Sequence, residues 1–93
     1  MITAAVIPTS AKIISPSGCG RAWAVFQNNS MAGIWIKFDP SSTTLTSTNG
    51  ILIPTNGTPF KLDKSNDGPS PFQNNIYAIA TGGNPTLIYH DSV

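Results

Sequence analysis

The 93-residue sequence contains little charge. It has five basic and four acidic side chains, no glutamate, and a formal net charge of +1. Charged residues make up 10% of the chain, whereas soluble domains average about 25%. The basic residues are scattered and do not form the clusters that bind phosphate backbones, so we expect no nucleic-acid partner. Coiled coils and helical bundles are excluded as well, because they need Glu, Lys, Leu and Ala in quantity.

Cysteine pairs and long apolar segments are also missing. The single cysteine, Cys19, has no partner in the chain for a disulfide. No apolar run approaches the roughly 18 residues of a transmembrane helix, so we expect no membrane partner. Residues 1–8 have neither a basic start nor a long apolar stretch. They therefore do not form a secretory signal, and we expect synthesis in a reducing cytoplasm.

Small polar residues and turn formers take the place of charge. The chain has ten serines, ten threonines, eight asparagines, eight glycines and eight prolines. Eleven isoleucines and three valines supply the β-branched side chains that favour strands. A chain of this length forms one domain, because two would each be too short to bury a core.

Apolar and polar residues alternate in short runs, which is the pattern of half-buried β-strands. The clearest predicted strands cover residues 22–27, 34–38, 51–53, 60–63, 76–80 and 86–90. We therefore expect an all-β fold of six to eight strands. The prediction is a single small antiparallel β-sandwich, jelly-roll-like or immunoglobulin-like.

Turn residues separate these runs. Asn56-Gly57 is the strongest hairpin signal, because both residues tolerate a positive φ. Residues 82–85, which read GGNP, predict another turn. Asn28 and Asn29 follow a strand, where their side chains can close the next turn.

Residues 1–20 differ in character from residues 21–93, which we assign to the β-sandwich domain. Two short apolar stretches, 4–7 and 12–14, are bounded by Pro8 and Pro16. The segment is predicted either to supply the first strands of the same domain or to form an extended arm. An apolar arm of this kind can pair with a neighbouring subunit by adding a strand to its sheet.

The sequence offers no catalytic or metal-binding pattern. His90 and Asp91 are adjacent on a predicted strand, so they point to opposite faces and cannot act together on a nucleophilic serine. One cysteine and one histidine, far apart in the chain, do not form a metal site. We expect no enzymatic activity and no cofactor.

Trp35 is the aromatic residue of greatest interest, because it faces away from Ile34 and Ile36 on the same predicted strand. Most of the aromatic residues are expected in the core or at its rim, and Trp35 is the one expected to be exposed beside Lys37, as an anchor for a protein interface. The alternative is a sugar-stacking surface made by Trp35 or Trp23. The expected interface residues are Ile2, Val6, Ile7, Ile13, Ile14, Trp35 and Lys37.

The order of these strand patterns is distinctive. Residues 21–30 read RAWAVFQNNS and residues 34–38 read IWIKF. They are followed by GILIP at 50–54, FKL at 60–62 and NIYAIA at 75–80. This succession resembles small virion proteins of tailed bacteriophages. Where that pattern usually has Pro-Gly-Gly, this chain has a longer turn after residue 53.

The resemblance implies a structural protein without catalytic residues. We expect a capsid decoration (cement) protein on the exterior of the virion, made in the cytoplasm of a bacterial host. Its expected partners are the major capsid protein and further copies of itself, with a trimer favoured. The alternatives are a neck, tail or head-fibre component, and a carbohydrate-binding module for host attachment.

Overall fold

A computed structural model of the chain describes residues 2–15, 23–39, 43–63 and 74–91. Across these ranges the regular structure is all β, which confirms the predicted fold class. The strands are β1 (Ile2–Val6), β2 (Lys12–Ser15), β3 (Trp23–Asn28), β4 (Ile34–Asp39), β5 (Ile51–Ile53), β6 (Phe60–Asp63), β7 (Asn75–Ala80) and β8 (Thr86–Asp91).

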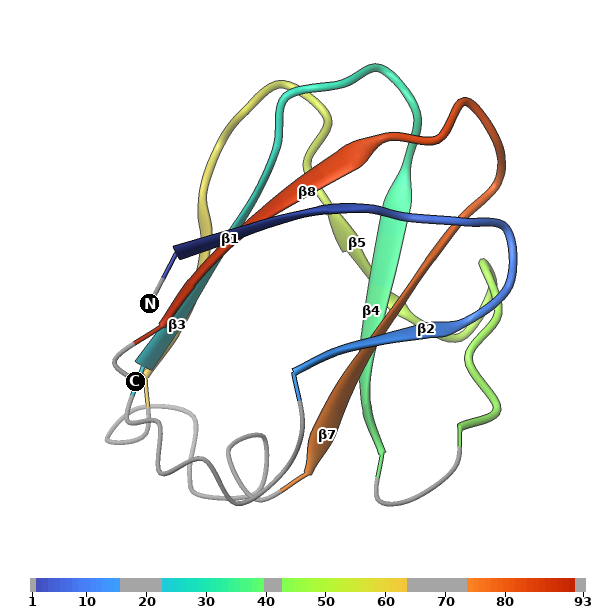
Figure 1. The fold of residues 1–93 in the computed structure, drawn as a ribbon, viewed down its shortest axis with the longest axis horizontal. Helices are drawn as coiled ribbons and strands as arrows, with labels where there is room; N and C mark the ends of the chain where they lie inside the picture. Colours follow the sequence, from blue (N-terminus) through green and yellow to red (C-terminus); the bar gives the residue numbers. More distant parts are fainter. Residues whose placement is uncertain (1, 16–22, 40–42, 64–73, 92–93) are drawn as a thin grey trace.

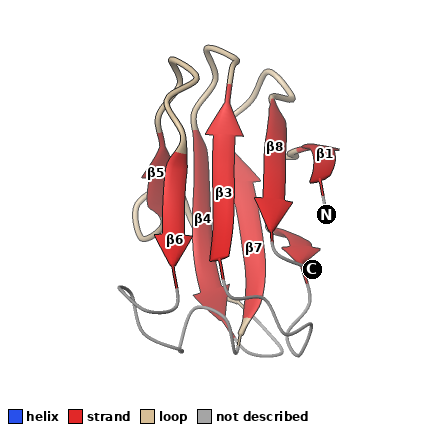
Figure 2. Cartoon of the chain, turned by 90° about the vertical axis from the view of Figure 1, so that its left-hand side faces the viewer, coloured by secondary structure: helices blue, strands red, loops and turns tan. Residues whose placement is uncertain are grey.

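The strands form two four-stranded antiparallel sheets. Sheet A has the order β1-β8-β3-β6, and sheet B has the order β2-β7-β4-β5. Figure 2 shows β6, β3 and β8 of sheet A in front of β5, β4 and β7 of sheet B. Immunoglobulin domains keep their first two strands in one sheet, but here β1 and β2 lie in different sheets. The strand order is that of an eight-stranded jelly roll.

The core lies between the sheets and follows from the alternation of side chains along each strand. On β3 the buried and half-buried residues alternate, as they do on β7. Phe26 lies near the middle, with its ring centroid 5.1 Å from that of Tyr89 and 6.1 Å from that of Phe60. The other buried apolar residues of this cluster are Ile7, Ala24, Ile34, Ile36, Ile53, Leu62, Ile76, Ala78, Ala80 and Leu87.

In Figure 1, β1 and β2 lie in front of most of the other strands, at one edge of each sheet. β1 pairs with β8, and β2 pairs with β7. Between them Ile7 is fully buried, and its N–H donates to the Pro85 carbonyl at 2.9 Å. The Pro8 carbonyl accepts from the Ala80 N–H, also at 2.9 Å. Of the two arrangements expected for the first 20 residues, the described part, 2–15, is paired within its own chain.

Asn28 closes the turn after β3, as the sequence predicted. Its side chain is fully buried, and its Nδ2 donates to the Ala32 carbonyl at 2.8 Å. Its Oδ1 accepts from the backbone N–H of Ser30 at 3.0 Å and from the Ser30 hydroxyl at 2.5 Å. The three bonds hold the chain in the sharp bend that leads from sheet A to sheet B.

The turn at Asn56-Gly57 is present, but its predicted role as a hairpin is wrong. Gly57 has a φ of +83°, and its N–H donates to the Asn28 carbonyl at 3.1 Å. However, the turn connects β5 of sheet B with β6 of sheet A, and these two strands do not pair. It is therefore a crossover between the layers of the sandwich.

Candidate interaction surface

The described residues bring together no group of three or more His, Cys, Asp or Glu side chains that could hold a metal ion. His90 is exposed, whereas Asp91 is buried and accepts a hydrogen bond from the Tyr89 hydroxyl at 2.7 Å. The two neighbours therefore lie on opposite faces of β8, as predicted. No helix long and apolar enough to cross a membrane occurs in the part of the chain that the structure describes.

The outer face of sheet B carries large side chains in two rows across the strands. In the first row, Ile13 of β2 lies opposite Tyr77 of β7, which lies opposite Lys37 of β4. The second row, from β7 to β5, consists of Ile79, Trp35 and Leu52. Leu52 is 52% exposed and Ile13 is 45% exposed. We call these six residues the sheet B patch.

Trp35 points outward, as the alternation predicted, but it is only half-buried instead of exposed. A Cβ placed on Gly33 would lie 2.8 Å from the Cη2 atom of the indole, so the ring packs against that glycine. A Cβ on Gly50 would lie 2.8 Å from the Trp35 Cβ and 2.6 Å from the Cδ1 of Leu45. Leu45 is buried, and it lies near the Trp35 Cβ at Gly50, so the 43–49 segment packs beside the tryptophan.

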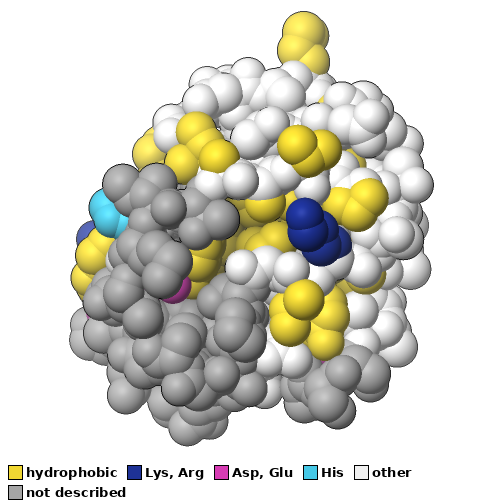
Figure 3. Space-filling model, viewed as in Figure 1, with side chains coloured by type: hydrophobic (Ala, Val, Ile, Leu, Met, Phe, Trp, Pro, Cys, Tyr) yellow, Lys and Arg dark blue, Asp and Glu magenta, His cyan; other side chains and the backbone are white. Residues whose placement is uncertain are grey.

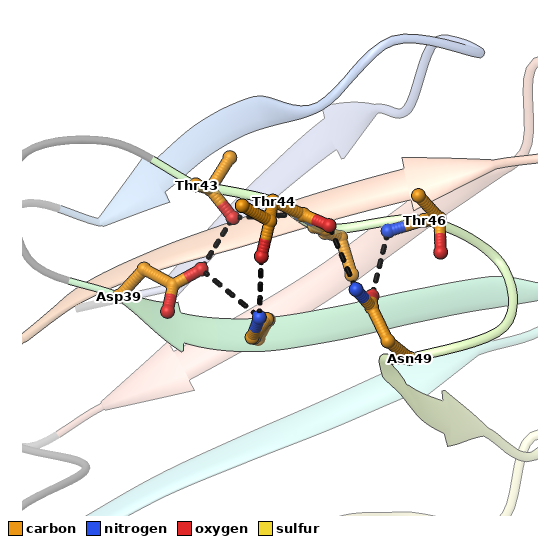
Figure 4. A network of polar contacts seen from close by, with 7 residues as sticks. Asp39, Thr43, Thr44, Thr46 and Asn49 are labelled. Atoms are coloured by element: carbon orange, nitrogen blue, oxygen red, sulfur yellow. Dashed lines mark hydrogen bonds and ion pairs between the residues drawn. The ribbon is translucent and has the colours of Figure 1, made fainter.

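A polar network that includes Asp39, Thr44 and Asn49 holds the 43–49 segment on the sheet (Figure 4). Lys37 belongs to this network. Its Nζ donates to the Thr44 hydroxyl at 2.9 Å and lies 3.7 Å from the Asp39 carboxylate. The Thr43 hydroxyl donates to the same carboxylate at 2.5 Å. Asn49 joins the far end of the segment, with 2.7 Å bonds to the Thr44 carbonyl and the Thr46 N–H. The lysine therefore has intramolecular partners.

The outer face of sheet A carries both apolar and polar side chains, because Trp23 lies opposite Asp63 and Val25 lies between Lys61 and His90. On this face the rings of Trp23 and His90 pack edge to face, with their centroids 5.1 Å apart. Ala4 of β1 lies opposite Ile88 of β8, and Val6, which is 55% exposed, lies opposite Thr86. Figure 3 shows hydrophobic side chains in several separate groups over the face on which β1 and β2 lie in front, with a Lys or Arg side chain among them.

The seven residues predicted for an interface do not lie on one surface. Ile13, Trp35 and Lys37 share the sheet B patch, whereas Val6 lies on the outer face of sheet A. Ile7 is fully buried, so in this fold its side chain has no surface to offer a partner. The two remaining residues are Ile14, which packs against the core, and Ile2, whose backbone pairs with His90.

Sequence reasoning missed half of the sheet B patch. Leu52, Tyr77 and Ile79 were predicted only as strand residues, because alternation along one strand does not show which strand lies beside it. Leu52 has a recognisable signal: the ILI strand at 51–53 is apolar at every position, so one side chain of the three has to point away from the core.

A shallow depression of about 340 Å³ lies where the turn after β3 meets the turn before β8. Gly83, with a φ of +74°, and Asn84, with a φ of +45°, form its rim, which explains the GGNP sequence. Its lining is uncharged and consists of Asn29, Ser30, Gly83, Asn84, Pro85, Thr86 and Ile88. None of these side chains is a nucleophile activated by a neighbouring base.

Comparisons with known proteins give no match: no family model, no curated protein and no solved structure resembles the chain at a significant level.

Proposed function

We propose that this protein is a structural subunit of a bacteriophage virion, a capsid decoration protein that binds the major capsid protein on the outer shell. The proposal rests on the order of strand patterns described above and on the surface of the molecule. Jelly rolls build viral capsid proteins as well as lectin and cupin domains, so the fold is compatible with this role and the surface has to carry the argument.

The observation that carries the proposal is the sheet B patch. Leu52 and Ile13 expose about half of their side-chain surface on a sheet face where they flank Tyr77 and Trp35. Contiguous apolar surface with an aromatic at its centre is typical of protein interfaces. The patch contains one charged residue, Lys37, which is already paired with Asp39. Binding at this surface therefore leaves no unpaired charge buried.

The experiment that tests this role is a count of copies per purified virion, made by quantitative mass spectrometry against the major capsid protein. A ratio near one to one supports decoration of the shell, because every capsomer then carries the protein. A few copies to a few dozen per particle would place the chain in the neck, tail or head fibre, and absence from the particle would overturn the virion role.

A variant at the patch tests the surface. Leu52→Asp puts a charge at the exposed edge of the patch, where binding to a capsid would have to desolvate it. We expect occupancy on particles to fall at least tenfold, while thermal stability changes little. The matched control is Thr55→Asp, which adds the same charge at an exposed turn position outside the patch. Equal occupancy for both variants would contradict binding through this surface.

A further inference from the structure

The two sheets end in four edge strands, and these edges differ in how well they are protected against pairing with another chain. β6 carries Lys61 and Asp63. β2 carries Lys12 and has an irregular register between Ile13 and Ser15. Charges and bulges of this kind prevent strand addition at a sheet edge.

β1 and β5 carry no charged residue of their own and keep a regular register with their partner strands. β5 is only three residues long and is followed directly by Pro54, so it offers few backbone groups to another strand. β1 has the sequence ITAAV, with no charge and no proline, and keeps a regular register with β8 over all five residues. Within the described residues no strand pairs with its other side. β1 is therefore the longest unprotected edge.

The direction of the β1 backbone groups follows from one hydrogen bond. Ile7 donates its N–H to Pro85, which directly precedes β8. In an antiparallel ladder, residues whose N–H and C=O face the partner strand alternate with residues whose groups face away. The groups of Thr3 and Ala5 therefore face β8, and those of Ile2, Ala4 and Val6 face the open edge. In agreement, the Lys12 Nζ reaches the Val6 carbonyl from the other sheet, at 3.5 Å.

We propose that the open edge of β1 pairs antiparallel with β1 of a second copy of this chain, about a two-fold axis at Ala4. The three open positions are symmetric about Ala4. In this register Ala4 pairs with Ala4 of the second copy, and Ile2 pairs with Val6. Each of these pairs exchanges both of its backbone hydrogen bonds, so every open donor and acceptor of β1 is satisfied by the same strand in the other copy.

A second copy fits this edge because the edge is self-complementary. Both partners are uncharged along β1, so pairing brings no like charges together. The small exposed side chain of Ala4 lies at the axis, where a larger residue would meet its own copy. The contact is isologous and closes as a dimer, which differs from the trimer expected from the resemblance. It requires only self-association, so it stands independently of the virion role.

The test uses charge complementation at the axis. Ala4→Lys and Ala4→Asp each place two like charges directly opposite one another in the pair, and each is expected to weaken the dimer about fivefold. Mixing the two variants places opposite charges together and should restore pairing, as a heterodimer. Native mass spectrometry and analytical ultracentrifugation of the full chain measure both effects. Ala4→Ser, which keeps the N–H and a small side chain, is the control and should dimerise like the original.

Amide hydrogen exchange gives a second readout that does not depend on substitutions. The N–H groups of Ala4 and Val6 should exchange more slowly as protein concentration rises, because they become bonded in the dimer. The N–H groups of Thr3 and Ala5 face β8 and should show no such dependence. A monomer at all concentrations, a trimer, or a mixture of charged variants that does not pair would each overturn the proposal.

Discussion

Asn28 shows how strongly a single residue shapes this fold. It is fully buried, yet its amide satisfies the Ala32 carbonyl, the Ser30 N–H and the Ser30 hydroxyl. Its own carbonyl accepts from the Gly57 N–H. One side chain therefore stabilises the turn after β3, and the backbone of the same residue binds the turn between β5 and β6. Both turns connect the two sheets.

We expect Asn28→Ala to destabilise the protein by about 2–3 kcal/mol, because it leaves part-buried backbone groups of the turn without partners. For a domain of this size that lowers the melting temperature by roughly 8–24 °C, which calorimetry can measure. The adjacent Asn29 is exposed, so Asn29→Ala is the matched control and should change stability by less than about 0.5 kcal/mol. Similar losses for the two variants would contradict this assignment.

Residue-level prediction succeeded where the cause was local and failed where it was not. The turn-closing role of Asn28 follows from its own side chain and its place after a strand. The outward direction of Trp35 follows from the two-residue period of a strand. Its partial burial does not, because Gly33 lies against the indole ring and Leu45 lies near the Trp35 Cβ at Gly50, and both come from outside the strand. The burial of Ile7 does not follow from the local sequence either, because it depends on β1 and β2 pairing with different sheets on either side of this residue.

At the scale of elements, the question is whether β1 and β2 form a separable arm or an integral part of the sandwich. If residues 2–15 were an arm, their removal would leave a folded domain. Here their removal takes Ile7 out of the core and uncovers β8 and β7. We expect a chain lacking residues 2–15 to show no cooperative thermal unfolding, as followed by circular dichroism.

The control for that deletion is Ile13→Ala, which alters the same segment at an exposed side chain. This variant should unfold cooperatively at a temperature close to that of the original protein, because truncating an exposed side chain removes few buried contacts. A truncated chain that still melts cooperatively would identify the segment as an arm. Binding experiments on the truncated chain are therefore interpretable only when the melting curve is known.

Strand positions were predictable from the sequence, but strand partners were not. The runs at 51–53 and 60–63 match β5 and β6 residue for residue. Asn56-Gly57 between them predicted a hairpin, since two short strands and this dipeptide are its usual signal. The same dipeptide also serves a crossover, because both connections need a positive φ at the glycine. Only the arrangement of both sheets distinguishes the two cases.

For the whole molecule, the strand order couples the two sheets. Most connections pass from one sheet to the other, and among the described strands β4 and β5 are the consecutive ones that pair. The first described strand, β1, pairs with the last, β8. Neither sheet can therefore assemble from a local stretch of the chain, and the core that stabilises them forms only when both are present.

Folding kinetics should reflect this coupling. Folds dominated by distant pairings refold in milliseconds to seconds, and we expect that range here.

Each sheet carries one tryptophan, Trp23 in sheet A and Trp35 in sheet B. Trp23→Phe leaves a reporter in sheet B, and Trp35→Phe leaves one in sheet A. Stopped-flow fluorescence of each variant should give one exponential phase. Its rate should equal the refolding rate that circular dichroism measures for the same variant. A sheet whose tryptophan signal changes well before the circular dichroism would form on its own, and the strand order would then not be what makes the two layers fold together.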